Sequence, residues 1–102
     1  MLKLRVNKTR LKGHEACLIS VDVDKRDNID LDLAYAEYVQ KLEDRCDAKV
    51  GVLTSLDLPI HLFVTLLRAT ADVLGTAAVS LPEGVVVVFA EPGGPFAAGD
   101  FL

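Results

Sequence analysis

Residues 59–74, PIHLFVTLLRATADVL, constrain the fold of this chain most, because they contain more apolar residues than one side of a helix can hold. Proline fits the first position of a helix, and Gly75 suits the left-handed conformation just past its end, so this pattern predicts a helix over 59–74. Four of its polar residues recur at spacings of four, three and four: His61, Thr65, Arg68 and Asp72. We therefore expect three buried sides and one narrow strip open to water or a ligand.

Strand patterns surround this helix on both sides. LKLRV and ACLISVDVD alternate apolar with polar residues and predict an antiparallel hairpin. KVGVLTS is a short apolar run typical of a central strand, and TAAVSL and VVVVFA predict two further strands joined by a turn at PEG. The end of the chain, EPGGPFAAGDFL, reads as loop residues that finish in a short edge strand.

A second amphipathic helix is predicted over residues 31–45, where apolar residues recur at helical spacing and either Asn28 or Asp30 is suited to cap the start. The elements therefore follow the order β-β-α-β-α-β-β. This order indicates an α/β fold with one mixed sheet of four or five strands and both helices packed against it, forming one domain over residues 1–102.

Length and charge limit the partners of such a chain. The 102 residues carry a formal net charge of −4, which argues against a broad interface with duplex DNA. Five cationic residues cluster in the hairpin, where a solvated charged face is the simplest reading: Lys3, Arg5, Lys8, Arg10 and Lys12. Because 51% of the residues are hydrophobic, we also expect a homodimer or a higher homo-oligomer.

The two cysteines, Cys17 and Cys46, lack the spacing of a zinc site and are too few for a disulfide scaffold. We therefore expect reduced thiols in a cytoplasmic protein. The N-terminal residues have no apolar stretch of signal-peptide length, and no segment approaches the roughly 20 apolar residues that span a bilayer. We expect no membrane role.

The loop between the central strand and the helix is the most informative candidate site. Thr54 and Ser55 offer hydroxyls, and the amides at the helix start can hold a phosphate. The carboxylate of Asp57 counts against ligand binding, because it more naturally satisfies those amides itself by capping the helix. Capping and ligand binding remain two open readings. His61 in the first turn is suited to contact a base or to act as a general base. The chain contains no G-x-G-x-x-G, no P-loop motif and no G-x-S-x-G.

The segment from Lys49 to Leu102 resembles the small CRISPR-associated ring nucleases of type III systems. That family has an apolar strand, a loop S-G-R/K-x-P, a helix, a strand ending in D-P-R-x-G, a run of valines and a later G-D-x-I. The matching positions in this chain include five named residues besides the valines: Ser55, Pro59, Gly84, Gly99 and Asp100. Ser80-Leu81-Pro82 stands in place of D-P-R, and Asp72 stands in place of a histidine.

The resemblance implies binding, with possible cleavage, of a cyclic oligoadenylate second messenger in antiviral defence, and some family members use manganese. In this chain it implies that His61 and Asp72 act at the scissile linkage. The ligand contacts it implies are Thr54, Ser55, Asp57, Arg68 and Ser80. The chain lacks the aspartate and the arginine of the D-P-R motif. A second hypothesis therefore stays open, in which the chain has lost the ligand and serves as a non-catalytic interaction or oligomerisation module.

Overall fold

The computed structural model describes residues 2–23, 29–55 and 57–102. The strands are β1 (Leu2–Leu11), β2 (His14–Val23), β3 (Val50–Leu53), β4 (Thr76–Leu81) and β5 (Gly84–Ala90). The helices are α1 (Leu31–Arg45) and α2 (Ile60–Leu74). The predicted α/β fold and the order β-β-α-β-α-β-β are confirmed over this part of the chain.

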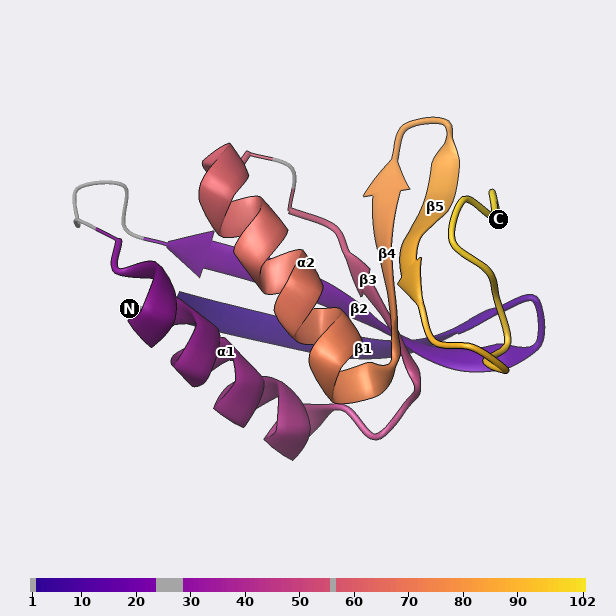
Figure 1. The fold of residues 1–102 in the computed structure, drawn as a ribbon, viewed down its shortest axis with the longest axis horizontal. Helices are drawn as coiled ribbons and strands as arrows, with labels where there is room; N and C mark the ends of the chain where they lie inside the picture. Colours follow the sequence, from indigo (N-terminus) through magenta and orange to yellow (C-terminus); the bar gives the residue numbers. More distant parts are fainter. Residues whose placement is uncertain (1, 24–28, 56) are drawn as a thin grey trace.

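The strands form one mixed sheet in the order β1-β2-β3-β4-β5. β2, β3 and β4 are parallel, and β1 and β5 flank them as antiparallel partners. Both helical crossovers step in the same direction across the sheet, so α1 and α2 lie on the same face (Figure 1). Neither helix passes over β5, which is the strand farthest from α1 (Figure 1).

The main core lies between the helices and the sheet. Tyr38 of α1 and Leu66 of α2 are fully buried there, and Ile19 of β2 packs in the same cluster. The Tyr38 hydroxyl bonds to the hydroxyl of buried Thr70, which also donates to the Leu66 carbonyl. Burial raises the pKa of Tyr38 to about 12, against a smaller lowering by its bond to Thr70. This hydrogen-bonded pair fixes the spacing of the two helices above the sheet.

The helix ends follow local rules in part. Asp30 caps α1 by accepting from the amides of Asp32 and Leu33, as one of the two predicted caps, while Asn28 lies outside the described residues. α2 begins one residue after Pro59 and ends at Gly75, whose φ of 100° favours glycine. The predicted end at Leu74, just before Gly75, is therefore confirmed. The start lies one residue later than predicted, because Pro59 has ψ 139° and is the N-cap instead of the first helical residue.

The expectation that α2 is buried on three sides is wrong. Ile60 is 73% exposed and Val64 is 50% exposed, while the polar Thr70 is buried. Ile60 and Val64 lie one helical turn apart and form an apolar flank of α2, whereas Leu67 on the next turn is buried in the core. Because no third helix lies beyond α2 in the described residues, this apolar flank lacks a neighbour.

The C-terminal segment covers the opposite face of the sheet. Phe96 and Leu102 pack against Val52, Ala78 and Val87, which form a second cluster there. Residues 99–102 also pair with β5, since the Val87 amide donates to the Asp100 carbonyl at 2.9 Å and the Leu102 amide donates to the Val85 carbonyl at 2.7 Å. The predicted terminal edge strand is therefore present as a bridge between Val86 and Phe101.

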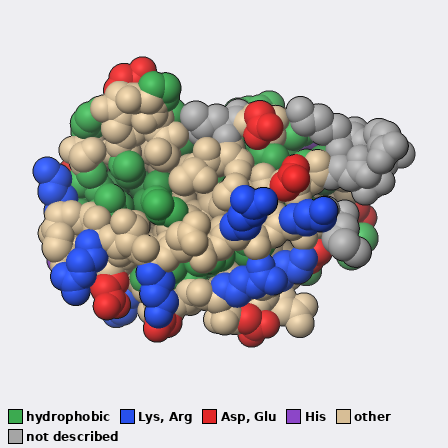
Figure 2. Space-filling view, turned by 180° about the vertical axis from the view of Figure 1, so that it is seen from behind, with side chains coloured by type: hydrophobic (Ala, Val, Ile, Leu, Met, Phe, Trp, Pro, Cys, Tyr) green, Lys and Arg blue, Asp and Glu red, His purple; other side chains and the backbone are tan. Residues whose placement is uncertain are grey.

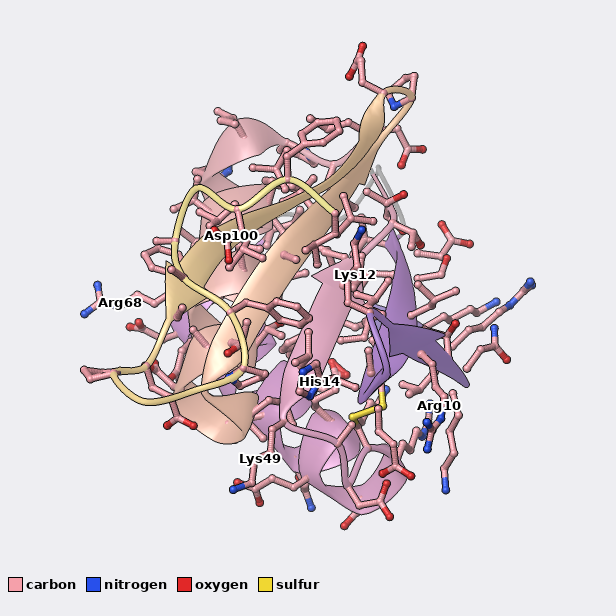
Figure 3. All side chains as sticks on the ribbon, turned by 90° about the vertical axis from the view of Figure 1, so that its right-hand side faces the viewer. Arg10, Lys12, His14, Lys49, Arg68 and Asp100 are labelled. Atoms are coloured by element: carbon pink, nitrogen blue, oxygen red, sulfur yellow. A yellow bond between two sulfur atoms is a disulfide. The ribbon has the colours of Figure 1, made fainter. Side chains whose placement is uncertain are left out.

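The expectation of two reduced thiols is also wrong. Cys17 of β2 and Cys46 at the end of α1 form a disulfide, with Cα atoms 6.4 Å apart (Figure 3). Cys17 is fully buried and Cys46 is nearly so. The crossover from β2 through α1 brings these positions together across 29 residues of sequence, a proximity that counting cysteines cannot reveal.

Candidate functional site

The candidate site lies where the parallel strands end and α2 begins, which is the usual ligand-binding edge of an open α/β sheet. Thr54 follows β3 directly, and its amide and hydroxyl both bond to the Ile19 carbonyl of β2, at 2.9 and 3.0 Å. The Ser55 hydroxyl accepts from the Val21 amide at 2.8 Å and lies 3.4 Å from the Ser20 hydroxyl. These two residues extend the β2–β3 pairing and fix the loop that leads into α2.

The start of α2 presents free amides. The first intrahelical bond runs from the Phe63 amide to the Pro59 carbonyl, so the amides of Ile60, His61 and Leu62 have no partner within the helix. Among the described residues no side chain caps this end, and its first turn contains no acid. The capping reading of Asp57 is therefore wrong: Pro59 occupies the N-cap position, and the Asp57 carboxylate, two residues earlier, is exposed and caps none of these amides.

The predicted polar strip continues along α2 from this end. His61 and Arg68 are both exposed, and the Arg68 side chain points away from the body of the molecule (Figure 3). Seven residues of helix place them about 10 Å apart along the axis. Thr65 lies between them and donates its hydroxyl to the His61 carbonyl. The helix dipole and the Arg68 guanidinium together make this surface favourable for a negatively charged group.

Asp72 belongs to a different environment at the far end of α2. Its carboxylate accepts a hydrogen bond from the Tyr35 hydroxyl of α1, and this bond, aided by partial burial, raises the pKa of Tyr35. Asp72 also lines a hollow of 520 Å³ together with one cation, Lys49, and three other acids: Glu43, Asp47 and Glu91. The carboxylates that line this hollow repel a negatively charged ligand. This end of α2 therefore does not suit a phosphate.

Ser80 lies beside Thr54 at the carboxyl edge of the parallel strands, because the register that pairs Leu53 with Val79 places the residues that follow them side by side. It lies near the end of β4, two residues after Ala78, and therefore shares Ala78's side of the sheet, away from the helices. His61 and Arg68 lie on the helical side. Thus Thr54, Ser55, Asp57 and His61 lie at one edge of the sheet, with Arg68 beyond them. Ser80 lies at the same edge but on the face away from the helices, and Asp72 lies at the far end of α2.

The sequence reasoning missed two partners of these residues. Ser20 contacts Ser55, and Tyr35 holds Asp72. The contact between Ser20 and Ser55 follows from the parallel pairing of Ile19 with Leu53, because this register places Ser20 beside the residues that follow β3. Nothing in the local sequence identifies the second pair, since it depends on how the helices pack.

A manganese ion, which the family resemblance allows, finds no matching ligand set here. Nowhere in residues 2–23, 29–55 or 57–102 do three or more His, Cys, Asp or Glu side chains converge as metal ligands. In the same ranges, no helix is long and apolar enough to cross a membrane.

Comparisons with family models, with curated proteins and with solved structures returned no match to this chain.

Proposed function

We propose that this chain binds a cyclic oligoadenylate second messenger at the start of α2. The observation that carries the proposal is the uncapped N-terminus of α2, which presents the amides of residues 60–62 at the carboxyl edge of three parallel strands. The resemblance to CRISPR-associated ring nucleases supports it, because the strand, loop, helix, strand and valine strand of that family have counterparts in this order.

The residues at this edge have distinct parts in the proposed complex. The free amides and the helix dipole bind one phosphate, and Arg68 reaches a second phosphate further along the ring. His61 lies between them and contacts an adenine or a ribose. Thr54 and Ser55 act mainly by holding the loop in place, because β2 already engages their hydroxyls.

The proposal is that the chain binds the ligand. It does not include cleavage of the ligand by residues of a single protomer. His61 and Asp72 are 11 positions apart on α2, or about 16 Å along the helix, so they cannot act together on one phosphodiester. Asp72 is also engaged by Tyr35. A cytoplasmic location and exclusion of duplex DNA belong to the same proposal.

Replacement of Arg68 by Ala is expected to weaken binding of cyclic tetra-adenylate about tenfold, because one charge-assisted hydrogen bond is lost. Calorimetric titration measures the affinity, and chromatography of the same samples shows whether the ring stays intact. Lys49→Ala is the matched control, since Lys49 precedes β3 and lies at the opposite end of the sheet from the start of α2. Equal affinities for Arg68→Ala and the parent would contradict the assigned contact.

A second candidate, self-association, is favoured by a separate observation. Five exposed apolar side chains form what we call the apolar strip: Ile60, Val64, Leu81, Phe89 and Phe101. Phe89 pairs with Ala77, and Phe101 bridges to Val86 opposite Val79, so both phenylalanines share the helical face of the sheet. The strip therefore borders the uncovered helical face of β5, beside α2.

We propose that a second copy of the chain packs its own α2 against the apolar strip. A twofold arrangement buries Ile60 and Val64 of both copies and completes the helical layer over β5. It also brings two starts of α2 toward one symmetric ligand, which makes the two candidate functions compatible.

Substitution Val64→Glu is expected to shift the chain from dimer to monomer in sedimentation at tens of micromolar. Leu33→Glu serves as the control, because Leu33 is 69% exposed on α1, one turn from Glu37 and on the flank nearest β1. A parent protein that sediments as a monomer would remove the self-association proposal and leave the ligand proposal standing.

A further inference from the structure

The outer edge of β1 is partly covered by α1. The Leu2 amide donates to the Glu37 carboxylate, while the Leu2 carbonyl accepts from Lys41 at 2.6 Å. The Leu4 carbonyl accepts from the Arg45 guanidinium. Because Leu2 and Leu4 direct their backbone groups away from β2, every second residue of this regular strand does the same. Val6, Lys8 and Arg10 are therefore the next positions with outward N–H and C=O groups.

No described residue bonds to these outward groups of Val6, Lys8 and Arg10. At the other side of the sheet, residues 99–102 pair with β5 and close that edge. Residues 6–10 thus form the open edge of the described sheet, ready to accept a further strand.

Cationic side chains outnumber acids around this open edge, although the chain has a net charge of −4. Lys and Arg side chains form a band across the face of the molecule opposite the helices (Figure 2). Arg10 and Lys12 project from the β1–β2 hairpin at the end of this edge (Figure 3). The cationic side chains on β1 and its turn, or bonded to its edge, are Lys3, Arg5, Lys8, Arg10, Lys12, Lys41 and Arg45. Four acids lie next to these cations: Glu15 opposite Arg10, Asp22 opposite Lys3, Glu37 paired with Lys41, and Asp47 paired with Lys8 at 3.9 Å.

We propose that the open edge of β1, residues 6–10, binds an extended acidic peptide segment of a partner protein by strand addition. The peptide backbone pairs with the outward groups of Val6, Lys8 and Arg10, and its carboxylates meet the surrounding cations. Beside the edge lies a pocket of 280 Å³, which accepts one side chain of the added strand. Its lining contains two cations, Lys8 and Arg10, and two acids, Glu15 and Asp47, so an apolar side chain such as valine suits it better than a carboxylate.

Charge and composition favour this occupant over the alternatives. A second copy pairing through β1 would set lysines and arginines against their own kind, which is the arrangement that protects natural edge strands. Single-stranded nucleic acid binds through aromatic stacking platforms, and β1 and its turn contain no aromatic residue. The unused groups are backbone donors and acceptors in alternation, which match a peptide backbone.

The test uses the full chain and a fluorescein-labelled, acetylated peptide Glu-Val-Glu-Thr-Glu-Val-Glu, with the same peptide carrying Lys in place of Glu as the control. We expect saturable binding of the acidic peptide alone, weakening as salt is raised, with amide shifts in NMR spectra centred on Val6, Lys8 and Arg10. Lys8→Pro should reduce the affinity about tenfold more than Lys8→Ala, because proline also removes an outward N–H. The hydrogen bonds between β1 and β2 are kept in this variant, since the Lys8 N–H faces away from β2.

Should Lys8→Pro fail to fold, the double variant Arg5→Glu, Lys8→Glu tests the charge requirement by itself and should abolish binding. The proposal is overturned if the acidic peptide produces no saturable shifts at millimolar concentration, or if its shifts lie away from β1. It is also overturned if Lys8→Pro binds like Lys8→Ala, or if an oligothymidylate binds the same residues more tightly than the peptide.

Discussion

Removing the Cys17–Cys46 disulfide should lower the free energy of unfolding by about 3 to 4 kcal/mol, because a cross-link across 29 residues restricts the unfolded chain. The disulfide also joins β2 to the C-terminal end of α1, which is the end opposite its Asp30 cap. Its loss is expected to loosen the last turn of α1 first, since Cys46 and Ala48 pack into the core just beyond it.

Urea unfolding of the parent with and without dithiothreitol measures this contribution directly. The double variant Cys17→Ala, Cys46→Ala is the control, because its midpoint should not respond to the reductant. A parent whose midpoint is the same with and without dithiothreitol, and which shows two titratable thiols before unfolding, would contradict the disulfide. Rapid alkylation of cells before lysis tests it in place, since a buried disulfide is uncommon in a reducing cytoplasm.

Gly51→Ala is expected to cost about 2 to 3 kcal/mol of stability through overpacking. A Cβ at Gly51 would lie 2.5 Å from Cγ2 of Thr70, 2.8 Å from Cδ1 of Leu74 and 3.0 Å from Cδ1 of Ile19. The leucine and isoleucine atoms end flexible side chains and can move. Thr70 cannot, because its hydroxyl is held by Tyr38 and by the Leu66 carbonyl.

The second-site variant Thr70→Ser sharpens this test, since serine keeps the hydroxyl and deletes Cγ2. It should recover a large part of the loss when combined with Gly51→Ala, although alone it should destabilise the chain slightly. Thermal unfolding of the four proteins completes the cycle. Strictly additive effects would show that α2 does not approach β3 at this point.

The fold was predictable because its signals are local. Alternation in the hairpin, helical spacing over 31–45 and the stop at Gly75 each depend on neighbouring residues, and all agree with the observed elements. The disulfide was not predictable in this way, since Cys17 and Cys46 meet only after α1 has crossed the sheet. The burial of α2 was overestimated for a related reason: apolar residues identify a face that can be buried, and in the part of the chain that the structure describes, nothing buries Ile60 and Val64.

The candidate site was predictable only as a location. The strand–loop–helix pattern placed Thr54, Ser55 and His61 at the correct edge of the sheet. The role of each hydroxyl depends on the register between β2 and β3, which directs the Ser55 hydroxyl to the Val21 amide. The regular spacing of polar residues on α2 grouped Asp72 with His61. Residues on one line of a helix are nevertheless far apart along its axis, and Asp72 lies at the far end, where it accepts a hydrogen bond from Tyr35.

The measurement that tests the proposed function most directly is an NMR titration of the isotope-labelled chain with cyclic tetra-adenylate. We predict saturable shifts at the amides of Ile60, His61 and Leu62, together with a ligand that chromatography recovers intact. No saturable shift at these amides, or shifts confined to other parts of the chain, would contradict the assignment of the start of α2 as the binding site.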